Sequence, residues 1–188
     1  MGKLIIITAP SGSGKSTIVN HLLQTFPRLA LSVSATTRAR RPYEADGREY
    51  YFITVSSFVQ YLRQGRFVEW EEVYPGQFYG TLKSELKRLW ALRKIIVFDI
   101  DVWGAKDLKR MFPKNSLAIF IKPPSLGVLR QRLQARNTET PEKIAVRMAR
   151  ASMEMDFENQ FDALVINDDL ETAKKEIELL IEKFIKGK

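Results

Sequence analysis

The sequence contains no cysteine and only one histidine among its 188 residues. The lack of cysteine excludes disulfides, thiolate catalysis and cysteine-ligated metals. No apolar run approaches the roughly 20 residues that span a bilayer. The apolar start, "MGKLIIITAP", is too short for a signal peptide and is broken at Pro10. We therefore expect a soluble cytoplasmic protein, long enough for one domain and without internal repeats or low-complexity segments.

The charge of the chain is unbalanced toward basic residues. It carries 30 Lys and Arg against 22 Asp and Glu, a net charge of +8. Such an excess suits polyanions such as nucleic acids, membrane surfaces or nucleotides, although it also serves solubility alone. A nucleic-acid binder is expected to spread its cations along a groove, whereas here they concentrate in two stretches, 35–80 and 125–158. We therefore expect nucleotides as ligands, and neither nucleic acid nor membrane as partner.

Short apolar runs alternate with longer amphipathic segments along the chain. The runs predict strands at 3–8, 29–34, 94–99, 117–121 and 163–166. Because they are rich in β-branched residues and lack polar alternation, they are typical of a parallel sheet buried on both faces. Helices are expected at 15–26, 104–111, 125–136, 141–158 and 171–186. This alternation predicts an α/β fold, a parallel sheet flanked by helices.

The two arginine-rich stretches interrupt this alternation. The first has only short strand-like pieces, at 50–53 and 67–70, and the second is helical. Long insertions of this kind are usually functional. We predict one domain over 1–188, with a core, an inserted flap and an inserted lid. The predicted bounds are 1–33, 82–124 and 159–188 for the core, 34–81 for the flap and 125–158 for the lid.

The stretch "TAPSGSGKST" at 8–17 lies between the first strand and the first helix. It fits the phosphate-binding pattern G-x-x-x-x-G-K-[ST] except at its first position, Ala9, which works there if φ stays below zero. In such a loop backbone N–H groups and a helix N-terminus face the phosphates, Lys15 would reach the β- and γ-phosphates, and Ser16 would hold Mg²⁺. A plain strand-to-helix turn is the alternative. The predicted ATP-binding loop is Ala9, Pro10, Ser11, Gly12, Ser13, Gly14, Lys15, Ser16 and Thr17.

A phosphate-binding loop also needs an acidic residue at the end of a neighbouring buried strand, to organise the metal. The segment "KIIVFDID" supplies Asp99 after an apolar run, and Asp101 follows on the same side of the strand. We predict Ser16 and Asp99 as metal ligands, with Mg²⁺ as cofactor and a nucleoside triphosphate as ligand.

The chain offers no obvious general base. His21 is placed inside the first helix, on the side away from Lys15, and we interpret it as a surface or packing residue. Phosphoryl transfer to a hydroxyl usually needs a base. Transfer to another phosphate does not, because a phosphomonoester with a second pKa of about 6 is already an anionic nucleophile. Such a reaction needs cations that bring two anions together, and the two arginine-rich stretches contain them.

The segment "SATTRARRPYEADGREYYF" (34–52) resembles the one that identifies guanylate kinases. The segments "FVEW", "YGT", "DID", "RNTET" and "VINDDL" match in order, so the resemblance covers essentially the whole chain. It implies the fold of P-loop nucleoside monophosphate kinases, with a GMP-binding flap and a lid. It also implies ATP:GMP phosphotransferase activity in purine nucleotide metabolism, with ATP and GMP as substrates.

The resemblance also implies roles for individual residues. Glu69 would accept hydrogen bonds from guanine N1–H and the exocyclic amine, and adenine has no such donor pair. Ser34 and Thr81 would address the O6 edge, and Asp101 would support the guanine end. The GMP phosphate would be held by Arg38, Arg41, Tyr50 and Tyr79.

Further residues are implied on the ATP side. Arg136 and Arg147 in the lid would close on the ATP phosphates, and Asn167 and Asp168 would contact the adenine side. The residues expected to act in catalysis are Lys15, Arg41, Arg136 and Arg147. We interpret Arg130 and Arg150 as solvated surface charges.

The sequence departs from the family pattern at three positions. Trp103 stands where the family usually has glutamine, Tyr43 replaces a common glycine, and Pro75 precedes "FYG". Two alternatives remain: a kinase of another small phosphate, such as a ribose bisphosphate, and a guanylate-kinase-like module that binds phosphopeptides. Such modules typically lose the loop lysine or the lid arginines. We expect a monomer or a small homo-oligomer.

Overall fold

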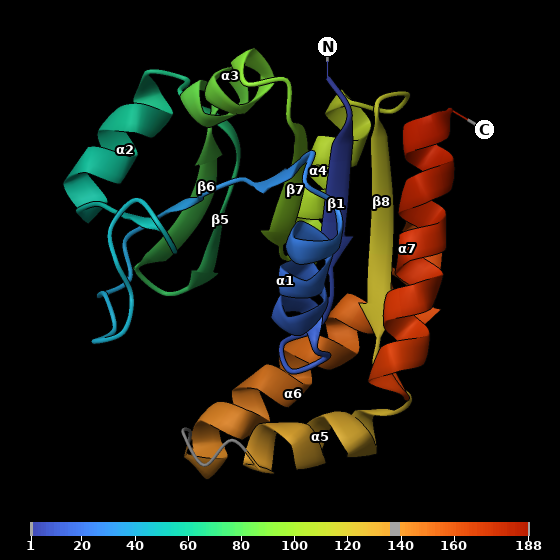
Figure 1. Ribbon diagram of the computed structural model, residues 1–188. Coiled ribbons are helices and arrows are strands. Elements are labelled where there is room, and N and C mark those ends of the chain that lie inside the picture. Colours follow the sequence, from blue (N-terminus) through green and yellow to red (C-terminus); the bar gives the residue numbers. More distant parts are fainter. Residues whose placement is uncertain (1, 136–139, 188) are drawn as a thin grey trace.

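The computed structural model describes residues 2–135 and 140–187. Five strands form a parallel sheet in the order β2-β7-β1-β8-β9 (Figure 1). Their bounds are β1 Leu4–Thr8, β2 Leu29–Leu31, β7 Ile95–Ile100, β8 Ser116–Lys122 and β9 Ala163–Ile166. The helices around this sheet are α1 Lys15–Thr25, α3 Lys83–Ala91, α4 Val102–Met111 and α7 Leu170–Lys186. This confirms the α/β class, with a central parallel sheet flanked by helices.

The sheet is covered on both faces. Alternate residues of β1 point to opposite sides, so Ile5 and Ile7 pack under α1 and α7, while Leu4 and Ile6 pack under α3 and α4. All four side chains are fully buried. This double burial explains why the strand reads as a continuous aliphatic run.

Most predicted core elements are present, with shifted ends. The predicted strand at 29–34 ends at Leu31, and β7 continues through Asp99 to Ile100. Asp101 is not part of a strand: it is the N-cap of α4, and its side chain accepts from the N–H groups of Trp103 and Gly104. Helix α3 was not predicted from the sequence.

The segment between β2 and α3 forms a second sheet of four strands, in the order β4-β3-β6-β5. Its elements are β3 Ala35–Thr36, β4 Tyr51–Phe52, α2 Val55–Arg63, β5 Phe67–Tyr74 and β6 Gln77–Leu82. The predicted pieces 50–53 and 67–70 contain β4 and the first half of β5, whereas β3, α2 and β6 were not predicted. Phe58 of α2 stacks on Phe67 at 4.3 Å between ring centroids and forms a small separate core. In Figure 1 this sheet stands beside the main one.

Two helices, α5 Leu126–Ala135 and α6 Pro141–Met155, pack on each other below the end of the main sheet that carries the β1–α1 loop (Figure 1). Helix α6 begins at the N-cap Thr140, followed by Pro141 at its first position. The predicted helix 141–158 ends at Met155, and a short 3₁₀ turn, η1 Glu158–Gln160, follows. Arg136 lies outside the described residues. None of the helices among residues 2–135 and 140–187 is both long enough and apolar enough to cross a membrane.

Candidate functional site

The loop between β1 and α1 is shaped for phosphate. Gly12 and Gly14 have φ of 100° and 90°, which other residues rarely adopt, and Ala9 keeps a negative φ as expected. Gly14 is the N-cap of α1, and no side chain caps the helix there. The first N–H groups of α1 therefore have no capping side chain among the described residues, and together with the helix dipole they are suited to bind an anion.

Asn167, which follows β9, stabilises the phosphate loop by a hydrogen bond. It is buried directly after β9, and its side-chain N–H donates to Ser13 O at 2.7 Å. A Cβ on Gly14 would overlap the Asn167 amide, so glycine is needed there for space as well as for φ. Asn167 and Asp168 do not line the cavity described below. Their contact with adenine stays a prediction, while the support of the loop by Asn167 is a role that the sequence did not reveal.

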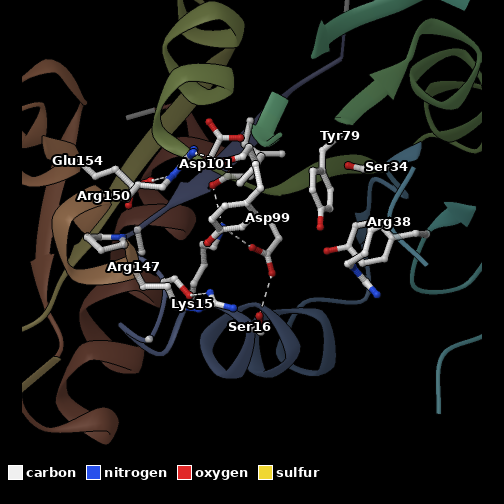
Figure 2. Close-up of a pocket in the computed structure, with 18 of the residues that line it drawn as sticks. Lys15, Ser16, Ser34, Arg38, Tyr79, Asp99, Asp101, Arg147, Arg150 and Glu154 are labelled. Atoms are coloured by element: carbon white, nitrogen blue, oxygen red, sulfur yellow. Dashed lines mark hydrogen bonds and ion pairs between the residues drawn. The ribbon is translucent and has the colours of Figure 1, made fainter. Parts of the chain in front are cut away.

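Lys15 and Ser16 contact Asp99 near the carboxyl end of β7, an inner strand of the main sheet (Figure 2). Lys15 Nζ lies 2.7 Å from Asp99 Oδ1 and donates to Ile100 O at 2.8 Å. Ser16 Oγ donates to Asp99 Oδ2 at 3.2 Å. A hydroxyl and a carboxylate side by side next to the phosphate loop are the hard oxygen donors that Mg²⁺ prefers. The two predicted metal ligands therefore fit the ion, although no cluster of three or more acidic or histidine side chains occurs among the described residues.

A cavity of about 350 Å³ opens between the loop, the second sheet and α6. Most residues predicted from the sequence line it: Ala9, Pro10, Ser11, Gly12, Gly14, Lys15, Ser16, Thr17, Ser34, Arg38, Arg41, Tyr50, Glu69, Tyr79, Asp99, Asp101 and Arg147. Ser13 and Thr81 are fully buried behind it. Groups far apart in the sequence thus share one cavity.

Arg38, which follows β3 of the second sheet, is a cation held in place by its neighbours. Arg38 donates two hydrogen bonds to Glu44, at 3.0 and 2.7 Å, and lies over the Tyr50 ring at 5.4 Å. Glu44 is buried, and the hydrogen bonds from Arg38 lower the pKa of its carboxyl. Burial, with Asp99 nearby, raises the pKa of Tyr50 to about 12, so its hydroxyl stays protonated and can donate. Glu44 was part of the sequence motif but was not recognised as the residue that orients Arg38.

Glu69 lies on β5 at the wall of the cavity and is only 5% exposed. Burial raises the pKa of its carboxyl to about 7. Among the described residues, neither Glu69 Oε1 nor Thr81 Oγ1, its neighbour in register on β6, has a hydrogen-bond partner. A Cβ on Gly104 of α4 would come within 2.7 Å of Glu69 Oε2, so this glycine leaves room for the carboxylate. A buried acceptor without a partner is suited to a ligand that brings N–H donors.

The comparisons with known proteins agree with this arrangement. The family model for guanylate kinase matches residues 1–184.

The chain belongs to the guanylate kinase family.

Guanylate kinase from Bacteroides fragilis is 46% identical over 183 residues, which cover 97% of this chain and 90% of that protein. Guanylate kinase from Porphyromonas gingivalis is 46% identical over 186 residues, 98% of this chain and 99% of that protein. Among solved structures, guanylate kinase from Anaplasma phagocytophilum superposes with a TM-score of 0.78 at 29% identity, covering 96% of this chain and 85% of that one. The chain is therefore similar over nearly its full length to kinases of this family.

The guanylate kinase pattern did not lead us to Arg150, whose interpretation as a solvated charge is wrong. Its side chain is 18% exposed, and its guanidinium donates to Glu154, Glu71 and Val73 O. Glu154 is four residues along the same helix, but Glu71 and Val73 are distant in sequence, so no local pattern indicates the contact with β5. Arg130 on α5 is exposed, as expected.

Two further predictions concern residues at the edges of the site. His21 Nε2 lies 2.5 Å from Glu178 Oε1 on α7, outside the cavity lining, so its interpretation as a packing residue fits its position. Arg147 NH1 donates to Ser11 Oγ at 2.5 Å, which brings α6 against the phosphate loop. Its predicted neighbour in this role, Arg136, lies outside the described residues.

Proposed function

We propose that the chain transfers the γ-phosphoryl group of ATP to the phosphate of GMP. The observation that supports this proposal is the buried carboxylate of Glu69, a residue that lines the cavity and whose Oε1 has no hydrogen-bond partner among the described residues. Guanine offers N1–H and an exocyclic amine to such a carboxylate. Adenine offers no such pair, and it would leave Glu69 buried and unpaired.

The acceptor phosphate would be oriented by the second sheet. Arg38 is pre-positioned by Glu44, and Arg41, Tyr50 and Tyr79 line the same cavity. The phosphate needs no base, because its oxygens are already anionic near neutral pH. The task of these side chains is to hold one anion close to another in a productive geometry.

The donor would bind on the loop. Lys15 must exchange its contacts with Asp99 and Ile100 O for the β- and γ-phosphates. Arg147 is close enough to the loop to stabilise charge on the transferring group. Mg²⁺, held by Ser16 and Asp99, would supply charge neutralisation for the phosphates.

The test is a coupled assay of ADP release with ATP and Mg²⁺, using GMP, AMP, UMP or no acceptor. We expect turnover with GMP, little with the others, and a loss of at least about a hundredfold in Glu69→Gln. Glu72→Gln, an exposed glutamate on the same strand, is the matched control and should keep wild-type rates. A kinase of another small phosphate would turn over none of these acceptors, and a binding module would bind GMP without acceptor-dependent turnover. Either result would overturn the proposal.

A further inference from the structure

Arg150 joins three parts of the molecule. It lies on α6, and its guanidinium contacts the second sheet at Glu71 Oε1, 2.7 Å away, and at Val73 O, 2.9 Å away. It also lies over the ring of Trp103 on α4, at 4.9 Å from the ring centroid. Its Nε–H donates to Glu154 one turn along its own helix, at 2.8 Å. Figure 2 shows Arg150 and Glu154 entering the pocket from α6 near Asp101.

The contacts of Arg150 are largely buried, unlike those of an exposed ion pair on the surface. Glu154 is 4% exposed, and burial raises the pKa of its carboxyl even though Arg150 opposes this. The Trp103 ring itself packs edge-on against Phe157, at 5.7 Å between centroids. The guanidinium thus contacts two carboxyl groups, a carbonyl and an aromatic face, and its planar arrangement of donors fits them at the same time. Arg150 therefore fixes the distance between α6 and β5.

Helix α6 also reaches the donor side. Arg147 precedes Arg150 by about one turn and donates to Ser11 of the phosphate loop. On β5, Glu69 and Glu71 alternate with Trp70 and so lie on the same face of the strand. One helix thus touches the loop that would bind the triphosphate and, through Arg150, the strand that carries Glu69.

We propose that Arg150 is a positioning residue that couples the two nucleotide sites, so that a bound triphosphate tightens the binding of GMP. This rests on the proposed function, since it assigns the two sites to ATP and GMP. Arg147 already contacts the loop through Ser11, so a triphosphate that binds there would act on α6, and Arg150 would pass this effect to β5, the strand that carries Glu69. The coupling is reciprocal, so GMP tightens the binding of the triphosphate by the same factor.

Trp103 is part of this coupling. It replaces the glutamine usual at this position in the family, and its ring supports the guanidinium from the core side. The departure from the family pattern therefore has a specific partner, Arg150, and the two are expected to act together.

The experiment is calorimetric titration of GMP into the full chain, with and without a non-hydrolysable ATP analogue and Mg²⁺. For the wild type we expect the analogue to lower the Kd of GMP at least about fivefold, the low end of typical coupling between sites. In Arg150→Met the factor should fall below about twofold, while the Kd of GMP alone changes less. Arg150→Lys should restore part of the factor, and Arg130→Met, which removes an exposed arginine on α5, should keep all of it.

A purely structural role would give a different result. It would weaken GMP binding equally with and without the analogue and leave the ratio unchanged. An unchanged ratio in Arg150→Met, or no tightening in the wild type, overturns the proposal. If Arg150→Met does not fold, Glu71→Leu removes one of the two contacts of Arg150 to β5, since Val73 O remains, and should lower the ratio in part; an unchanged ratio in this variant overturns the proposal as well. Turnover of GMP by the wild type is measured in parallel. If GMP is turned over but the ratio is unchanged, only the coupling by Arg150 is refuted; if GMP is not turned over, the proposed function is refuted as well.

Discussion

Replacing Glu69 with glutamine should make the protein more stable and less active. The side chain is nearly isosteric, so the change tests charge rather than packing. The wild-type carboxyl is 5% exposed and has a pKa of about 7 in the fold, against an ordinary value of 4.5. Burial is the main cause, because it penalises the charged form.

The sign and size of the effect follow from the two pKa values. Because the folded pKa is raised, the protonated carboxyl stabilises the fold fully below pH 4.5, and this contribution is lost as the pH rises to 7. Each pH unit in this window lowers the free energy of unfolding by about 1.4 kcal/mol. Between pH 4.5 and 7 the free energy of unfolding therefore falls by about 3 kcal/mol, which is large against a typical net stability of about 5–15 kcal/mol. Glutamine does not titrate and avoids this loss.

The assay is urea unfolding of the wild type and Glu69→Gln between pH 4.5 and 8.5. We expect the advantage of the variant to grow by about 3 kcal/mol up to pH 7 and then to remain constant. Glu72→Gln, on the exposed side of the same strand, should give no such trend. An advantage of Glu69→Gln that does not change with pH would refute the reasoning, since it would mean that burial does not hold this carboxyl protonated.

Three further predictions concern the same pocket. The Kd of GMP for the wild type, measured by calorimetry, should rise about tenfold per pH unit below 7, because Glu69 must ionise to accept two donors. The Kd for Glu69→Gln should lack this dependence, and it serves as the control for titration of the GMP phosphate. Lys15→Met should lower kcat at least about a hundredfold while equilibrium binding of GMP is kept, and a loss of binding instead would contradict its place on the donor side. Glu44→Gln should raise the KM of GMP about tenfold because Arg38 loses a charged partner, whereas Glu49→Gln, which changes the half-buried partner of the exposed Arg48, should not; equal KM values for the two variants in steady-state kinetics would rule out this role.

The elements that the sequence revealed are those whose causes are local. The phosphate loop is encoded by glycines that need positive φ and by a lysine and a serine at fixed spacing. The core strands are encoded by aliphatic runs, because both faces of a parallel sheet are buried. Strand β6 was missed since "QFYGTL" contains polar residues and a glycine, and its strand conformation depends on pairing with β5 and β3.

The candidate site could be predicted only in part, because many of its contacts join residues that are far apart in the sequence. Resemblance to the family pointed to Glu69, but its burial and its missing partner depend on α4 and β6 packing around it. The interpretation of Arg150 was wrong because its contacts to β5 and α4 form only in the folded chain, and the support of the loop by Asn167 was not foreseen because its amide meets the loop only after β9 joins the sheet. Contacts made by tertiary packing leave no periodicity in the chain.

The cavity contains both signs of charge side by side, although the chain as a whole is basic. Lys15 pairs with Asp99, Arg38 with Glu44 and Arg150 with Glu154, and all six residues line the cavity. In Figure 2 Lys15 lies beside Asp99, and Arg150 beside Glu154. A phosphate that approaches one of these cations also meets the carboxylate next to it, and at 4 Å two like charges repel each other by about 1–4 kcal/mol between bulk-water and near-surface dielectrics. The carboxylates of the empty cavity thus hold its cations in place until a phosphate takes over as their partner.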